Sequence, residues 1–280
     1  MMRFALLAAL VCPTPAAAAL DPPAWTEPTA PFRIVGNIYY VGSKGLAAYL
    51  ITSPRGHVLL DGTMDENVEG IERNIEGLGF RLRDVKLLLN SHAHFDHAAG
   101  LARLKRDTGA TMVASAADRG ALESGTPPSI VSYGVVTFPA VKVDRLLREG
   151  RPERVGSIAL TPIVTPGHTP GCTTWTTTTK ERGRTLRVVF PCSLTVAGNK
   201  LIDNTGYPGI VADFRRSFPA TAKLRADVVL PGHPEGVELL ARAARRDAGD
   251  ADAFLMPGLL PKLAADAKKA FEAELTRQTK

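Results

Sequence analysis

Residues 91–100 read "SHAHFDHAAG" and hold three of the six histidines of the chain, with an aspartate between them. They follow "VKLLLNS" (residues 85–91), an apolar run that predicts a buried β-strand. A tag-like run, a solvated polar loop and a metal site are three possible explanations of this cluster. The remainder of the chain has to distinguish between them.

The cluster contains four possible metal ligands: His92, His94, Asp96 and His97. His92 and His94 come directly after the strand and are two residues apart, so their side chains should point the same way. Asp96 and His97 fall on the turn into the next helix and can face a second point nearby. Imidazole and carboxylate groups suit zinc. Four ligands are too many for one ion in an open site, and they fit part of a two-ion site.

Two further histidines stand alone in turns, His168 in "TPGHTPG" (165–171) and His233 in "LPGHPEG" (230–236). Each follows a β-like run, and a neighbouring glycine or proline fixes the turn and lets a metal approach the backbone. Taken alone, either histidine would be interpreted as an ordinary polar residue. The presence of the cluster favours both as metal ligands. His57, at the start of a strand, is expected at the surface and outside the site. The pattern predicts a dinuclear metal centre.

The flanking segments predict a layered α/β fold. Three runs before residue 62, "FRIVGNIYYVG", "AAYLITS" and "HVLLDG", predict consecutive antiparallel strands. Apolar residues recur at helical spacing over 66–78, and Gly79 stands where a C-terminal cap belongs. Further helices are predicted over residues 100–110, 116–124, 209–224 and 262–279. Strand clusters alternating with helices indicate sheets with both faces covered by helices. Residues 125–139 are expected to form a surface loop that flanks the substrate.

Length and composition are those of a globular enzyme. The 280 residues are 45% hydrophobic and 22% charged, which excludes disordered and fibrous classes, and we expect a single catalytic domain over residues 20–280. The net charge is +6. Its densest cluster, Arg242, Arg245 and Arg246, lacks interleaved aromatic residues and is interpreted as a solvated helix face rather than a nucleic-acid surface.

Residues 1–19 resemble a secretory signal peptide. They contain Arg3, an apolar run over 4–11 and then small residues, with cleavage expected after Ala19. The apolar run is too short to span a bilayer. The mature protein is therefore expected in the periplasm or secreted, and not bound to a membrane once the signal is removed.

Export bears on two cysteines, Cys172 and Cys192, because an oxidising compartment permits a disulfide. The segments on either side of "KERG" (180–183) predict two strands joined by a turn. If these strands pair as a hairpin centred near Arg182, the two cysteines lie opposite each other. Two buried free thiols are the alternative.

The motif H-x-H-x-D-H, followed by two isolated turn histidines, resembles the metallo-β-lactamase superfamily. The similarity extends from about Phe32 to the C-terminal helix and includes "LLDG" before the first helix. It implies an αβ/βα sandwich, in which two mixed β-sheets pack together with helices on both outer faces. It also implies that Asp61 of "LLDG" hydrogen-bonds near the ligands without binding metal.

The resemblance also divides the ligands between two zinc ions per chain. The first zinc would be held by three histidines, His92, His94 and His168. The second zinc would be held by an aspartate and two histidines, Asp96, His97 and His233.

Fold alone does not fix the substrate, because the superfamily includes β-lactamases, thioesterases, lactonases, nucleases and oxidoreductases. Thioesterases and lactonases usually carry "GD" on the strand between the two turn histidines, where this chain has "FPCSLTVAGN" (190–199) without a carboxylate. Ser193 and "GHTPGCTTW" resemble the third subclass of class B (zinc) β-lactamases. Cys192 is also a good zinc ligand, but only one of two adjacent strand residues can face the metals, and Ser193 is the one we choose.

The implied activity is opening of the β-lactam ring of penicillins, cephalosporins and carbapenems, and hence antibiotic resistance. A zinc-bound hydroxide, available because zinc lowers the pKa of water to about 7, would attack the carbonyl, with Asp96 orienting it as the catalytic residue. Ser193 and Thr195 would bind the substrate carboxylate, although ordinary strand hydroxyls are the alternative interpretation. We expect a monomer that acts on a small molecule, without nucleic-acid partners.

Two other functions are consistent with the fold. A lactonase or thioesterase should carry a bridging carboxylate before His233, and this chain has none there. A non-catalytic relative would be expected to lose ligands, and this chain retains all six.

Overall fold

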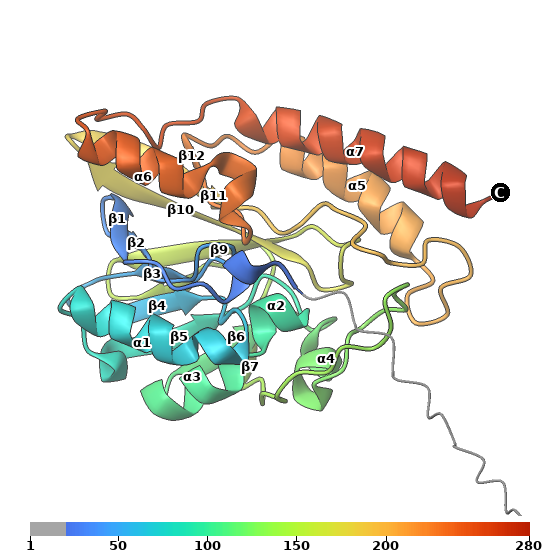
Figure 1. Cartoon of the computed structure of the whole chain (residues 1–280), viewed down its shortest axis with the longest axis horizontal. Coiled ribbons are helices and arrows are strands. Elements are labelled where there is room, and N and C mark those ends of the chain that lie inside the picture. Colours follow the sequence, from blue (N-terminus) through green and yellow to red (C-terminus); the bar gives the residue numbers. More distant parts are fainter. Residues whose placement is uncertain (1–20) are drawn as a thin grey trace, which may run out of the picture.

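The computed structural model describes residues 21–280, so the expected signal peptide, residues 1–19, lies outside the described residues. The described chain forms two β-sheets that pack face to face, with helices on the outer face of each (Figure 1). This arrangement confirms the expected αβ/βα sandwich of two mixed sheets.

The first sheet has seven strands in the order β1-β2-β3-β4-β5-β6-β7. The strands are β1 (Phe32–Val35), β2 (Ile38–Tyr40), β3 (Tyr49–Ile51), β4 (His57–Leu60), β5 (Val85–Leu89), β6 (Thr111–Ala114) and β7 (Arg145–Leu146). Neighbours pair antiparallel from β1 to β4 and parallel from β4 to β7. The run that begins at Phe32 makes two strands, because Gly36 takes a positive φ of 51° and turns the chain back.

The second sheet has five strands in the order β12-β11-β10-β9-β8. They are β8 (Glu153–Val155), β9 (Ile158–Val164), β10 (Thr173–Glu181), β11 (Arg184–Phe190) and β12 (Val228–Val229). β10 and β11 form the predicted hairpin, in which Glu181 pairs with Arg184. Its two turn residues, Arg182 and Gly183, both have positive φ, as in a tight two-residue hairpin turn.

Helices from the two halves of the chain cover opposite faces of the sandwich (Figure 1). The first sheet carries α1 (Val68–Gly77), α2 (Phe95–Ala98), α3 (Leu101–Thr108) and α4 (Arg119–Ser124). The second sheet carries α5 (Ile210–Ala222), α6 (Leu239–Asp247) and α7 (Leu259–Gln278). The helix predicted over 66–78 is confirmed as α1. Gly79, at a φ of 85°, caps it as expected.

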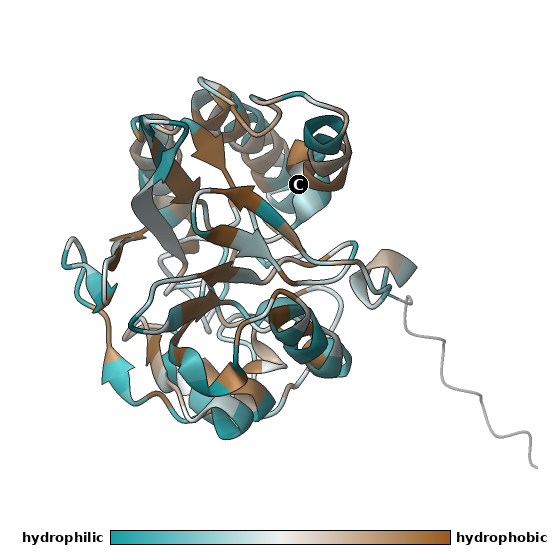
Figure 2. Ribbon diagram, turned by 90° about the vertical axis from the view of Figure 1, so that its left-hand side faces the viewer, coloured by the Kyte–Doolittle hydropathy of each residue, from teal (hydrophilic) through white to brown (hydrophobic). Residues whose placement is uncertain are grey.

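The central strands are buried on both faces, which explains their continuous apolar sequences. Leu60 of β4 and Leu89 of β5 point into the layer between the sheets, whereas Leu59 and Leu88 pack under the helices. Figure 2 shows the same pattern, with hydrophobic ribbon concentrated inside and hydrophilic ribbon outside. Trp175 of β10 is fully buried between the sheets and donates its indole N–H to Asn90 O, 3.1 Å away. This bond fixes the chain just where β5 ends.

The expectation for His57 is wrong, because its side chain is buried rather than at the surface. The ring of Phe80, which follows α1, packs edge-on against the His57 ring with centroids 4.9 Å apart. Burial lowers the pKa of this histidine. His57 nevertheless lies at the start of β4, and the predicted site residue Asp61 follows the end of that strand.

The basic cluster on α6 is only partly a solvated face. Arg245 is exposed, but Arg242 donates to Val237 O and Ala253 O at 2.7 and 2.8 Å. The guanidinium of Arg246 lies 5.6 Å from the centroid of the Phe254 ring. Two of the three arginines therefore hold the chain around α6 together.

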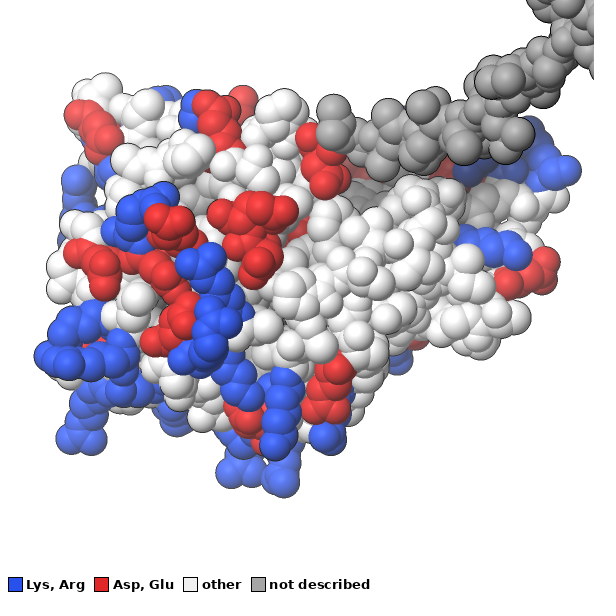
Figure 3. Space-filling model, turned by 60° about the horizontal axis from the view of Figure 1, so that its bottom comes forward, with Lys and Arg blue, Asp and Glu red and all other residues white. Residues whose placement is uncertain are grey.

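The face that carries α1 and α3 has charges of both signs interspersed over one part, beside a largely uncharged area (Figure 3). Ion pairs contribute to this mixture, including Arg73–Glu69 on α1 and Lys105–Asp144 at 2.7 Å. Among the helices of residues 21–280, none is long and apolar enough to cross a membrane.

Candidate metal centre

The six predicted ligands meet in a single cavity of about 940 Å³, a volume typical of small-molecule sites. They come from the loop after β5, the first turn of α2, the β9–β10 loop and the loop after β12. The ligands that line the cavity are His92, His94, Asp96, His97, His168 and His233.

Three buried histidines converge on one point, and we call His92, His94 and His168 the first group. The Nε2 atom of His168 lies 3.1 Å from His92 Nε2 and 3.0 Å from His94 Nδ1. On its other side, His168 Nδ1 donates to Thr195 O at 2.8 Å, so Nε2 carries the free lone pair. The convergence of His92 and His94 agrees with their spacing of two along the chain.

Asp96, His97 and His233 converge on a second point and form the second group. His233 Nε2 lies 3.2 Å from both His97 Nε2 and Asp96 Oδ2, and the latter two atoms are also 3.2 Å apart. The two groups adjoin, since the ring centroids of His92 and His97 are 4.3 Å apart.

The two groups differ in protonation. Burial holds the pKa of His92 and His168 well below the usual value and lowers that of His94 to about 4. Burial also opposes protonation of His97, but the carboxylates of Asp96 and Asp61 outweigh it and raise the pKa of His97 to about 10. At neutral pH the first group therefore presents uncharged imidazoles, while the second combines a carboxylate with a protonated ring.

The donor set fits bound metal ions. In the first group, ring nitrogens face one another at hydrogen-bond distance, although His168 Nε2 has no proton to share because Nδ1 carries it. His94 Nε2 is buried without a hydrogen-bond partner. A catalytic zinc site has three nitrogen or oxygen ligands around one point and an open side toward a cavity. Each group has this arrangement.

Asp61 lies behind the second group. Its Oδ1 accepts from Ser91 N at 2.6 Å and from Asn90 Nδ2 at 3.2 Å, and its Oδ2 lies 3.5 Å from His97 Nδ1. The Asp61 backbone has a positive φ of 63°, which is uncommon outside glycine. This buried carboxylate thus links the end of β5 to the His97 ring.

The glycines beside the turn histidines have a role that the sequence analysis did not predict. A Cβ at Gly232 would lie 2.5 Å from the His97 ring, and one at Gly167 would lie 2.7 Å from the Phe214 ring. The absence of a side chain therefore allows aromatic rings to pack against these turns.

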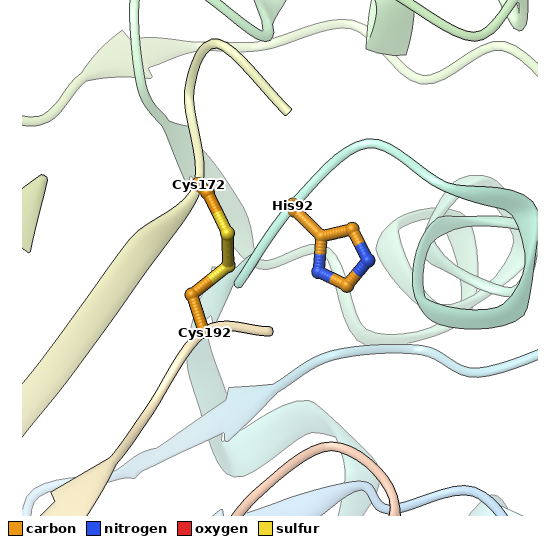
Figure 4. A group of neighbouring side chains, drawn as sticks. All are labelled: His92, Cys172 and Cys192. Carbon is orange, nitrogen blue, oxygen red and sulfur yellow. A yellow bond between two sulfur atoms is a disulfide. The ribbon is translucent and has the colours of Figure 1, made fainter. Parts of the chain in front are cut away.

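Cys172 and Cys192 form a disulfide, with Cα atoms 5.8 Å apart, at the end of the β10–β11 hairpin. The structure thus favours the bridge over two free thiols and removes Cys192 as a thiolate ligand. The bridge sits behind the first group: Cys192 Sγ is 3.4 Å from Ser91 O, and a nitrogen of the His92 ring lies within 4.8 Å of both sulfur atoms (Figure 4).

Ser193 and Thr195 both line the cavity, with their hydroxyl oxygens 3.0 Å apart. Sequence reasoning singled out these hydroxyls but missed the backbone carbonyl of Thr195, which orients His168. A carbonyl is present at every residue, so residue type gives no signal for such a role.

Sequence reasoning missed Trp25 and expected the loop over residues 125–139 near the substrate without assigning a residue in it. Trp25 lies in a short 3-10 helix (Pro23–Trp25), and its ring centroid is 5.5 Å from that of His233. Tyr133 and Val136 bring the loop over residues 125–139 to the cavity. Backbone hydrogen bonds such as Ser132 N to Gly198 O, at 2.8 Å, hold this loop in place.

Known proteins share this fold. Residues 45–233 match the metallo-beta-lactamase superfamily. BJP-1, a subclass B3 metallo-beta-lactamase of Bradyrhizobium japonicum, is 41% identical, with a TM-score of 0.87 over 92% of this chain and 97% of that one.

Two further solved structures are similar to this chain over most of its length. FEZ-1 from Legionella gormanii is 36% identical, with a TM-score of 0.86 over 90% of this chain and 98% of that one. MEM-A1, a subclass B3 enzyme from a soil metagenome library, is 35% identical, with a TM-score of 0.86 over 91% and 98%. The chain therefore belongs to the metallo-beta-lactamase superfamily, and it is a metal-dependent hydrolase.

Proposed function

We propose that this protein opens the β-lactam ring of penicillins, cephalosporins and carbapenems with two zinc ions bound. The observation that carries the proposal is the pair of adjoining ligand groups at one cavity, with Ser193 beside them. Support also comes from the similar structures, two of which are described as subclass B3 metallo-beta-lactamases.

In this proposal the first group holds one zinc ion and the second group holds the other. Bound zinc supplies Lewis acidity and makes water a nucleophile at neutral pH. Asp96 lines the cavity beside His92 and His97, where its carboxylate can accept a hydrogen bond from the attacking water and orient it. Asp61 holds the His97 ring from behind.

The cavity walls bind the substrate. The hydroxyls of Ser193 and Thr195 can donate to the carboxylate that β-lactam antibiotics carry, because both line the cavity. Trp25, Tyr133 and Leu194 supply apolar surface for the rest of the molecule. A lactonase or thioesterase would carry a bridging carboxylate in the segment that follows β11 (Arg184–Phe190). This chain has Ser193 and no carboxylate there, so the β-lactam is favoured.

We also propose that the protein is exported and acts outside the cytoplasm as a monomer that confers antibiotic resistance. The layout of residues 1–19 supports export. The Cys172–Cys192 bridge supports it independently, since disulfides persist in oxidising compartments.

The test is carbapenem hydrolysis by purified protein (residues 20–280), measured before and after a chelator and again after zinc is added back. We expect turnover that the chelator abolishes and zinc restores, with two zinc ions per chain by elemental analysis. Two bound zinc ions without turnover of any β-lactam would refute the proposal that β-lactams are the substrate. Lactones and thioesters would then be the substrates to test.

A further inference from the structure

Asp118 is a buried carboxylate next to the first group that no sequence motif singled out. It lies just before α4 and is 1% exposed. Its Oδ2 accepts from Ala93 N at 3.0 Å and from Thr169 Oγ1 at 2.8 Å, while its Oδ1 accepts from Gly171 N at 2.8 Å. Burial raises the pKa of this carboxyl to about 6 against these three donors.

These three hydrogen bonds join the two segments that supply the whole first group. Ala93 stands between His92 and His94, and Thr169 directly follows His168. Each of the three donors meets a carboxylate oxygen of Asp118. The side-chain amide of an asparagine could not accept all three hydrogen bonds, because its nitrogen donates and does not accept. Asp118 therefore fixes how closely His168 approaches the other two histidines.

The backbone of Gly171 packs closely against Ser115 and Asp118. A Cβ on Gly171 would lie 1.9 Å from Ser115 Oγ and 2.6 Å from Asp118 Cγ. Ser115 Oγ in turn accepts from Asp118 N at 3.1 Å. Side chain and backbone thus hold the β9–β10 loop against the segment after β6.

We propose that Asp118 is a positioning residue for the first group, which sets its metal affinity without touching metal or substrate. It corresponds to Asp61, whose contacts are with Ser91 and the His97 ring beside the second group. The inference rests on the proposed metal-binding role of the first group.

The test is site-resolved zinc affinity of Asp118→Asn, measured by competition with a chelator, together with cobalt absorption spectra of each site. We expect the affinity of the first group to fall roughly 10- to 100-fold and that of the second group to stay within about threefold. Asp61→Asn should weaken zinc binding by the second group, because Asp61 Oδ2 faces His97 Nδ1. Asp144→Asn is the matched control, because Asp144 also accepts a backbone N–H, from Met112 at 2.9 Å, but contacts neither loop.

Thr169→Val keeps the inference testable if Asp118→Asn does not fold. It removes one hydrogen-bond donor to Asp118 at nearly constant side-chain shape and should lower the zinc affinity of the first group several-fold. Thr108→Val, in α3, is its control and should leave the zinc affinity of both groups unchanged. The inference would be overturned if Asp118→Asn lowered the zinc affinity of both groups equally. It would also be overturned if neither Asp118→Asn nor Thr169→Val lowered the zinc affinity of the first group. Zinc binding without β-lactam turnover in the unmodified protein would refute the proposed substrate and leave the role of Asp118 intact.

Discussion

The two ligand groups share one cavity, but they present different chemistry to a metal ion. The first group consists of three buried imidazoles that are uncharged at neutral pH, as the pKa of about 4 for His94 indicates. The second group includes a carboxylate, a histidine with a pKa of about 10 and His233, whose side chain is 34% exposed. The first group can therefore accept a metal without releasing protons, whereas the second must exchange protons for metal.

The largest expected effect comes from removing one ligand from each group in turn. His94→Ala should empty the first group and lower kcat/KM by roughly 10³-fold, the scale of losing one electrostatic element of an active site. His233→Ala should remove only the second zinc, because the first group keeps all its ligands. Elemental analysis and hydrolysis assays measure both effects.

His57→Gln is the control for these two variants, since it alters the one histidine outside the two ligand groups and should leave two zinc ions bound. Loss of both zinc ions to the same extent in His233→Ala would show that the two groups are not separate sites.

A smaller effect is expected when Gly232 is replaced by alanine. The new methyl group would meet the His97 ring, so the second group should lose roughly 10- to 100-fold in zinc affinity while the first is spared. Gly236→Ala, four residues on, is a matched control because a Cβ there meets nothing within 4 Å. Chelator competition provides the measurement, and equal affinities in the two variants would contradict the packing argument.

The difference in protonation predicts different pH dependence of zinc affinity between about pH 6 and 8. The raised pKa of His97 means that this ring is protonated over that range, so zinc binding to the second group should strengthen by roughly tenfold per pH unit and per proton displaced. His94 is already deprotonated there, so the first group should hardly change. Zinc titrations at three pH values test this, and parallel slopes for the two groups would contradict it.

The smallest effect at the metal centre is expected from the disulfide, which lies behind the ligands rather than among them. Replacing both cysteines by serine should lower the free energy of unfolding by up to about 3 kcal/mol. Zinc affinity should change little, since Thr173 N still donates to Ser91 O at 2.8 Å and fixes the same loop. Urea unfolding of the two proteins measures the difference. An unchanged midpoint would show that the bridge adds no stability.

Much of the fold was predictable because its signals are local. The buried runs of β4 and β5, the periodicity of α1 with Gly79 as its cap, and the turn at Arg182 each depend on neighbours in sequence. Where expectations were wrong, distant residues intervened. His57 is covered by Phe80, and Arg246 of α6 stacks on Phe32 of β1.

The sequence by itself predicted the six candidate ligands, because H-x-H-x-D-H after a strand leaves few other uses for four such side chains, and the turn histidines add two more. Only the tertiary structure decided how these ligands are held and what surrounds them. The Asp118 carboxylate, the Thr195 carbonyl and the Trp25 ring reach the site from distant segments. Their roles depend on contacts between distant parts of the chain, which composition and periodicity do not specify.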